Sequence, residues 1–293
     1  MKKAILALLA ALLFGGAFAA EQPKPSAMGH PGLWRVTGKH STVYLFGSVH
    51  ILAPGLAWRD DRVDAAIRAA DTYYFEAPID AGAMKRMIES RGSLPPGQSL
   101  HAMLPPDSQH DLDMDLAALG LPEANIDTRR PWLVTIAMMG MRMSKTNKTP
   151  PTGVDLQIVQ EVQSRGRPMR YFETLEQQVA LMAPDDPKME LESFEMFLKD
   201  FQKEDDGIDD MTAAWMAGDE DKLATLIMKG FAQHPLARKA LFDDRNKAWL
   251  TTIEGVLDNE SGTFLVTVGA GHLLTERGVP ELLRRAGYKV EKL

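Results

Sequence analysis

The chain has 293 residues, no cysteine and a formal net charge of −7. This length allows one large domain or two small ones, with enough core to fold without disulfide bonds. The acidic balance disfavours nucleic acid as a partner, and the lack of cysteine excludes disulfide and thiolate chemistry.

The first residues have the pattern of a cleavable secretory signal. Two lysines precede an unbroken apolar run, Ala4–Phe14, and Ala17–Ala19 has the small-x-small pattern that a signal peptidase recognises. The run is shorter than the roughly 20 residues of a membrane-spanning helix. We therefore expect a signal peptide over residues 1–19, a disordered linker over 20–32, and a periplasmic or secreted product without an integral membrane segment.

The next part of the chain reads as two strands, a helix and a third strand. Apolar runs at 33–36 and 42–46 predict a β-hairpin. Apolar residues at helical spacing predict a helix over 60–70, and the aromatic and β-branched residues 72–75 predict a strand.

The remainder alternates between helical patterns and short strands. Proline-interrupted helical patterns predict a helical insertion over about 83–143. Strands are predicted at 169–172, 263–268 and 288–290, and a helix at 279–285. We expect residues 33–293 to form one α/β domain of mixed α+β character, with a largely parallel central sheet surrounded by helices.

Each predicted core strand ends on a residue that can bind a metal ion or transfer a proton. These residues are His50, Glu76, Glu173 and His272. Ligands of open α/β sheets bind outside the carboxyl ends of parallel strands. If the strands are parallel, the four side chains converge on one edge.

The two histidines share a Gly-x-x-His motif, beginning at Gly47 and at Gly269. With 23 glycines and 7 histidines in 293 residues, about half a Gly-x-x-His motif is expected by chance, whereas the sequence has these two, each directly after an apolar strand. A glycine at the end of a strand lets the chain turn sharply and lets a ligand approach the backbone. Both glycines are therefore candidate substrate-binding positions.

Two imidazoles and a carboxylate suit a divalent transition metal such as Mn, Co, Zn or Fe. We predict His50, Glu76 and His272 as metal ligands, with a bound water that attacks a carbonyl group. Glu173, the remaining carboxylate, would serve as a general base or would orient the ligands. On a predicted helix, Arg245 and Asn246 are candidates for binding substrate, and Arg245 also for stabilising an oxyanion.

A purely structural role for these residues also stays open, because His and Glu side chains at strand ends can cap helices and satisfy loop amides.

The sequence gives no support to serine hydrolases, zincins, NTPases or dinucleotide-binding enzymes. The sequence has no Gly-x-Ser-x-Gly, His-Glu-x-x-His, Walker or Gly-x-Gly-x-x-Gly motif.

Taken together, the motifs resemble the TraB/PrgY/GumN family, which includes the animal Tiki peptidases, and most closely its bacterial GumN-type branch. The resemblance spans about Leu33 to Val290. It rests on Leu33–Val36, Tyr44–His50, Phe75-Glu76, Arg130–Trp132, Gly153–Asp155, Phe172–Gln178, Asp244–Asn246 and Val268–Leu273.

The resemblance implies a site at His50, Glu76, Arg245 and His272, a fold related to erythromycin esterase and haem-binding ChaN-like proteins, and a Mn- or Co-dependent peptidase activity as in the Tiki branch. Two features depart from that pattern. No membrane anchor is evident, and Ala77-Pro78 follows Glu76 where many relatives have Glu-Leu-Asp. Both bear mainly on substrate identity.

Three functions are therefore open. The first is an exported metal-dependent hydrolase acting on a peptide or small-molecule substrate. The second is a non-catalytic envelope protein that binds peptides or assists polysaccharide assembly, and the third is a haem or metallophore binder.

Overall fold

The computed structural model describes residues 28–53, 55–146, 153–184, 186–201, 207–232 and 235–293. The predicted signal peptide and most of the predicted linker lie outside these residues. The last linker residues are held against the domain, because the Gly29 and His30 amides donate to the carbonyls of Ala57 and Met216, each at 2.7 Å.

One sheet organises the described chain, with its strands in the order β4-β3-β5-β2-β1-β6. Neighbouring pairs among β4, β3, β5 and β2 are parallel, whereas β1 is antiparallel to both β2 and β6. The predicted α/β class with a largely parallel sheet is confirmed. The strands are β1 (Leu33–Thr37), β2 (His40–Ser48), β3 (Thr72–Phe75), β4 (Met169–Tyr171), β5 (Ser261–Gly269) and β6 (Lys289–Lys292).

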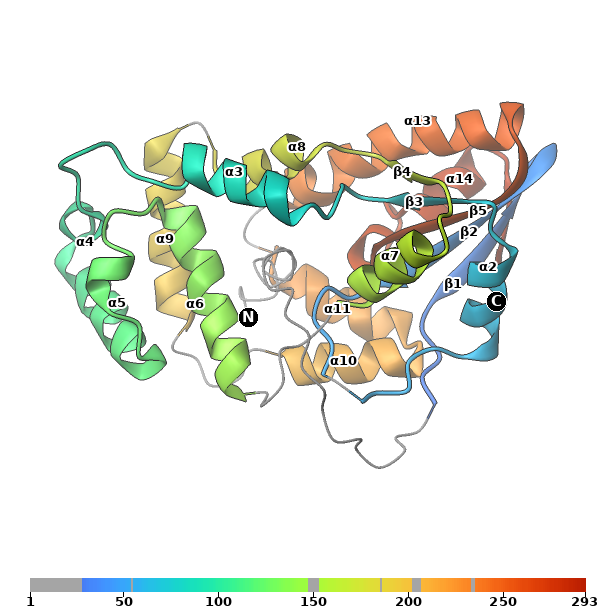
Figure 1. Ribbon diagram of the computed structural model, residues 1–293. Coiled ribbons are helices and arrows are strands. Elements are labelled where there is room, and N and C mark those ends of the chain that lie inside the picture. Colours follow the sequence, from blue (N-terminus) through green and yellow to red (C-terminus); the bar gives the residue numbers. More distant parts are fainter. Residues whose placement is uncertain (1–27, 54, 147–152, 185, 202–206, 233–234) are drawn as a thin grey trace.

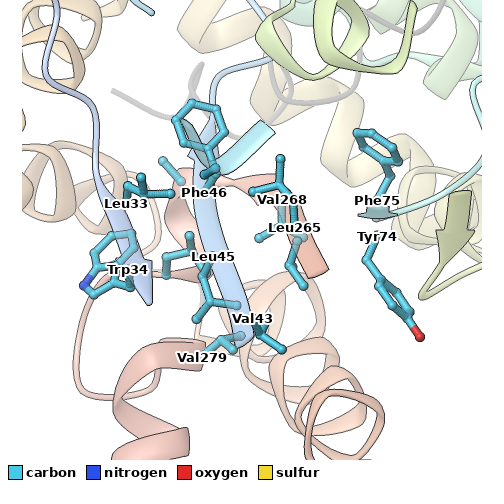
Figure 2. Packing of buried hydrophobic residues seen from close by; sticks show 14 of the residues in the cluster. Leu33, Trp34, Val43, Leu45, Phe46, Tyr74, Phe75, Leu265, Val268 and Val279 are labelled. Atoms are coloured by element: carbon cyan, nitrogen blue, oxygen red, sulfur yellow. The ribbon is translucent and has the colours of Figure 1, made fainter. Parts of the chain in front are cut away.

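Helices cover both faces of this sheet, so its central strands are apolar on both sides, as is typical of parallel sheets. Figure 2 shows the resulting core around β2 and β5. The covering elements are α2 (Asp61–Ala69), α7 (Val154–Ser164), α10 (Ile208–Ala217), α11 (Glu220–Lys229), α12 (Pro235–Arg238), η3 (Lys239–Asp243), α13 (Asp244–Asn259), η4 (Ala270–His272) and α14 (Val279–Arg285).

A second apolar core lies in a helical lobe beside the sheet (Figure 1). The predicted insertion at 83–143 supplies most of this core, and residues 175–201 complete it. Its elements are α3 (Ala81–Arg91), α4 (Leu100–Met103), α5 (Pro106–Leu119), η2 (Glu123–Asn125), α6 (Pro131–Thr146), α8 (Leu175–Met182) and α9 (Pro187–Phe201). None of the helices within the described ranges is both long and apolar enough to span a bilayer.

Substitutions at two glycines would test how closely the start of β2 packs against α13. A Cβ on Gly38 would lie 2.5 Å from the Leu257 carbonyl oxygen, whereas a Cβ on Gly255, inside α13, would meet nothing within 4 Å. Gly38→Ala should therefore lower the free energy of unfolding by about 1–3 kcal/mol through overpacking. Gly255→Ala should raise it by about 0.5–1 kcal/mol by restricting the unfolded chain. Urea denaturation measures the free energy of unfolding of each variant. Equal changes in the two variants would contradict the close contact between Gly38 and Leu257.

Candidate functional site

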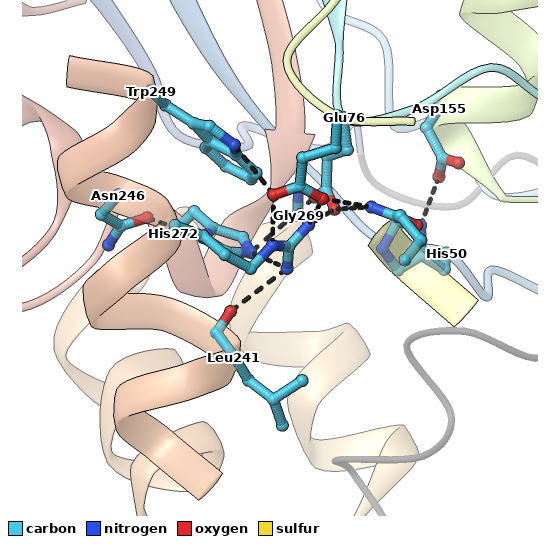
Figure 3. Close-up of polar contacts among 11 residues, drawn as sticks. His50, Glu76, Asp155, Leu241, Asn246, Trp249, Gly269 and His272 are labelled. Carbon is cyan, nitrogen blue, oxygen red and sulfur yellow. Dashed lines mark hydrogen bonds and ion pairs between the residues drawn. The ribbon is translucent and has the colours of Figure 1, made fainter. Parts of the chain in front are cut away.

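The four residues that follow the core strands meet at one edge of the sheet. Figure 3 shows Glu76 between the two imidazoles, with His50 on one side and His272 on the other. Glu76 Oε1 lies 3.9 Å from His272 Nε2. The strands are parallel, and this places their carboxyl ends together as expected.

Arg245 on α13 connects most of this cluster through its guanidinium group. Its five N–H groups match five hydrogen bonds. They run to Glu173 Oε1 (2.6 Å), Glu173 Oε2 (2.8 Å), Glu76 Oε2 (2.7 Å), His272 Nε2 (3.0 Å) and the Leu241 carbonyl (3.1 Å). The guanidinium therefore binds two carboxylates at once and is itself saturated with partners.

A π-helical segment, η3, precedes Arg245 and helps to place it. π-Helical turns are uncommon and often occur at functional sites, because the wider turn alters which backbone groups are paired. Here the Asp244 amide donates to the Lys239 carbonyl, and the Leu241 carbonyl accepts from the Arg245 side chain. The sequence analysis did not predict this segment, which no residue pattern in 239–243 distinguishes from an ordinary helix.

His272 is fully buried and neutral in this arrangement. A guanidinium can only donate, so Nε2 of His272 is the acceptor from Arg245, and Nδ1–H donates to Asn246 Oδ1 at 2.7 Å. The amide of Asn246 is fixed in turn by a bond from Nδ2 to the Arg277 carbonyl. Burial, reinforced by the Arg245 charge, lowers the pKa of His272 to about 3.

His50 has the opposite electrostatic environment. Its Nδ1 is 3.0 Å from Oδ1 of Asp155, which lies in the first turn of α7. Burial by itself lowers the pKa of His50, but the charge and hydrogen bond of Asp155, together with the charge of Glu76, raise it to about 9. The Gly153 position has no room for a side chain, because a Cβ there would lie 2.7 Å from the His50 carbonyl oxygen.

Glu76 is held in its ionised form by the groups around it. Burial opposes ionisation, yet the positive charge of Arg245, with smaller contributions from the two histidines, lowers the pKa of Glu76 well below its usual range. The Gly269 amide also donates to Oε1 at 2.7 Å. Glu76 therefore brings a fixed negative charge to the edge between the histidines.

Glu173 serves mainly to hold its neighbours. Both of its oxygens accept from Arg245, Oε1 also accepts from Trp249 Nε1 at 3.0 Å, and Oε2 accepts from Gln178 Nε2 at 3.0 Å. The Arg245 guanidinium lies 4.7 Å from the centre of the Trp249 ring, which also contacts the His272 ring. Glu173 thus positions Arg245 and leaves little capacity to act as a general base.

A small cavity of about 30 Å³ opens beside His50 and Glu76. This volume holds roughly a single water molecule. The hydroxyl oxygens of Ser48 and Thr267, which line the cavity, are buried and have no hydrogen-bond partner among the residues that the structure describes. Buried hydroxyls are normally paired, so these two are available to a water molecule or a substrate atom.

Two predicted substrate-binding residues lie elsewhere or are already engaged. The Gly47 carbonyl accepts from Trp215 Nε1, and Gly47 lines a different recess from that of His50. Asn246 is buried and uses both ends of its amide. The sequence analysis gave no role to Asp155, although the motif that contains it was recognised. It also gave none to Gln178, which bridges the two glutamates.

Comparison with known proteins shows the family of this chain. The model of the TraB/PrgY/gumN family matches residues 32–292. The chain belongs to this family. Among curated members of similar sequence, the uncharacterized protein YbaP of Shigella flexneri is 21% identical over 246 residues, which cover 84% of this chain and 88% of that protein. YbaP of Escherichia coli K12 is 21% identical over 241 residues, covering 82% and 87%. No solved structure shows a significant match.

The donors of this TraB/PrgY/gumN member fit a transition metal by their chemistry. Each histidine has Nδ1 engaged, by Asp155 or by Asn246, as is usual for histidines that bind metals through Nε2. Their arrangement differs from a ligand set, however. Among the residues that the structure describes, no group of three or more acidic or histidine side chains is placed to hold an ion. The guanidinium occupies the lone pair of His272 instead.

The His50–Asp155 pair predicts a pH dependence of stability in this family member. A pKa raised in the folded state stabilises the fold fully below the unfolded value of about 6.5, and the contribution disappears as the pH rises through about 9. Asp155→Asn should therefore lower the pKa of His50. It should also destabilise the protein most below about pH 6.5 and little above about pH 9.5.

Histidine NMR titration and urea unfolding across this range measure both effects. Asp113→Asn is a matched control, because Asp113 contacts the more exposed His101 at 3.3 Å. Its effect on stability should stay within about 1 kcal/mol. A loss of stability in Asp155→Asn that is the same at every pH would contradict the pairing.

Proposed function

We propose that this chain is an exported metal-dependent hydrolase that activates water against the carbonyl of a peptide or related amide. The observation that supports this most directly is the convergence of His50, Glu76 and His272, with Nδ1 of each imidazole anchored by Asp155 or by Asn246. A cavity of one-water size adjoins two of these residues.

His50 is suited to transfer the proton in this proposal. In its neutral form, Nε2 takes a proton from water while the water oxygen attacks the carbonyl carbon. Asp155 stabilises the imidazolium that forms and fixes the orientation of the ring. When the C–N bond breaks, the same imidazolium returns the proton to the leaving amine, so the products are a carboxylic acid and an amine.

The unpartnered hydroxyls of Ser48 and Thr267 supply donors for the oxygen of the tetrahedral intermediate. Arg245 is less suited to clamp the substrate directly, because its donors are already engaged. In this proposal it acts by holding the charges of Glu76 and Glu173 in place.

A divalent transition metal would be held by Glu76 and, once Nε2 is released by Arg245, by His272. The predicted ligand His50 is left out of this set, because its Nε2 has one lone pair and cannot bind the ion and accept the proton at the same time. When bound, the metal would lower the pKa of a water ligand and polarise the substrate carbonyl. Export is proposed from the signal-like residues 1–19. An exported protein would be periplasmic or secreted. Membership of the GumN-type branch remains a prediction from the motifs.

The alternative function is a non-catalytic envelope protein that binds peptides or assists polysaccharide assembly through the same cavity. The saturated hydrogen bonding of Arg245, Glu173 and Asn246 favours this alternative, since these groups stabilise a site without needing to react. It predicts affinity that survives both chelation and Glu76→Gln.

Cleavage of a peptide library, with and without Mn²⁺, tests the proposal. We expect turnover that falls by about 10²-fold or more in His50→Ala, because a general base is lost. The rate should rise with pH up to about 9, because only neutral His50 accepts a proton. His101→Ala, at a half-exposed position in the helical lobe, is the control. Binding of peptides without cleavage under either condition would support the alternative.

The hydroxyls of the cavity give a second prediction. Ser48→Ala and Thr267→Val remove buried groups that have no partner, so neither should lower the melting temperature. Both should reduce kcat/KM by about tenfold or more, because a donor to the transition state is lost. Ser108→Ala removes an equally unpartnered hydroxyl in the helical lobe and should leave kcat/KM unchanged. If all three variants behave alike, the hydroxyls have no part in turnover.

A further inference from the structure

The guanidinium of Arg245 occupies the atoms that a metal ion in this cluster needs. Its Nη1 is 3.0 Å from Nε2 of His272, and its Nη2 is 2.7 Å from Oε2 of Glu76. His272 has no second lone pair to offer, because Nδ1–H donates to Asn246. An ion can therefore bind His272 only after the guanidinium has moved away.

Charge makes the two occupants exclusive as well. Arg245 and Glu76 are each about nine-tenths buried, at 10% and 11% side-chain exposure. Like charges repel strongly in a poorly solvated site, so a guanidinium and a divalent cation do not share one carboxylate there. Arg245 already forms ion pairs with both carboxylates, Glu76 and Glu173.

The position of Arg245 is also built into the fold. The Leu241 carbonyl of η3 accepts from Nη1, and the Trp249 ring lies beside the guanidinium. Glu173 binds it through both oxygens. Moving the side chain thus means breaking several contacts together.

We propose that Arg245 is the resident cation of this cluster and competes with a divalent metal ion for Nε2 of His272 and the carboxylate of Glu76. The inference rests on the metal-binding part of the proposed function. It implies that the native chain binds a metal weakly, and that the arginine, rather than the set of ligands, limits the affinity.

Equilibrium dialysis or calorimetry with Mn²⁺ and Zn²⁺ on the full chain tests this competition. Removing Arg245 alone would leave two buried carboxylates without their guanidinium partner, which is strongly destabilising. We therefore pair Arg245→Met with Glu173→Gln, whose amide oxygen still accepts from Trp249. The double variant should bind the ion about tenfold tighter or more than Glu173→Gln alone.

Adding His272→Ala to the double variant should abolish that gain. The pair Arg170→Met with Glu260→Gln is the matched control, because Arg170 also binds both oxygens of a glutamate, at 2.8 and 2.9 Å, away from the cluster. This control should bind metal like the native chain. Arg245→Lys, which keeps a cation but has a less extensive donor set, gives an intermediate affinity and serves if the double variant fails to fold.

Equal affinity in the double variant and in Glu173→Gln, no binding by the double variant, or a gain that survives His272→Ala would overturn the competition. So would native-like affinity in Arg245→Lys. These outcomes differ from failure of the proposed function. Absence of peptide cleavage leaves the metal measurements interpretable, and equal metal affinities leave hydrolysis through His50 and Asp155 possible.

Discussion

The pairing of one guanidinium with two buried carboxylates is the interaction on which the site depends. Glu76 and Glu173 follow adjacent parallel strands, so the topology of the sheet forces two negative charges together. Arginine suits this position because it remains charged and offers donors in several directions at once. The neutral state of His272 and the orientation of Trp249 both follow from where that cation lies.

The two Gly-x-x-His motifs look equivalent in the sequence, yet their histidines are chemically different. An anionic partner favours a proton on His50, whereas burial and a neighbouring cation keep His272 neutral. One imidazole is thus suited to transfer a proton and the other to offer a lone pair. Asp155 favours the charged form of the first ring, and Asn246 fixes which nitrogen of the second ring carries its proton.

The sequence predicted the sheet well because its central strands are largely apolar and a polar residue follows each of the parallel strands. It also predicted that His50, Glu76, Glu173 and His272 meet, since that follows from parallel strands. It did not predict the hydrogen-bond partners of these four residues. The bond between His50 and Asp155 spans 105 positions, and the π-helical turn at η3 has no pattern of its own. Such features depend on tertiary packing rather than on local spacing.

The antiparallel pairing of β1 with β6 has a consequence for handling the protein. The register joins Trp34 to Lys292, and the Leu293 amide donates to the Leu33 carbonyl at 2.9 Å. Since β6 runs in the same direction as β2, the final residue emerges at the edge of the sheet that carries the histidines. A fluorophore or solid support coupled to Leu293 would lie next to Arg62, whose Nη1 donates to the Leu293 carbonyl at 2.6 Å, and would be separated by β1 from the strands that line the cavity.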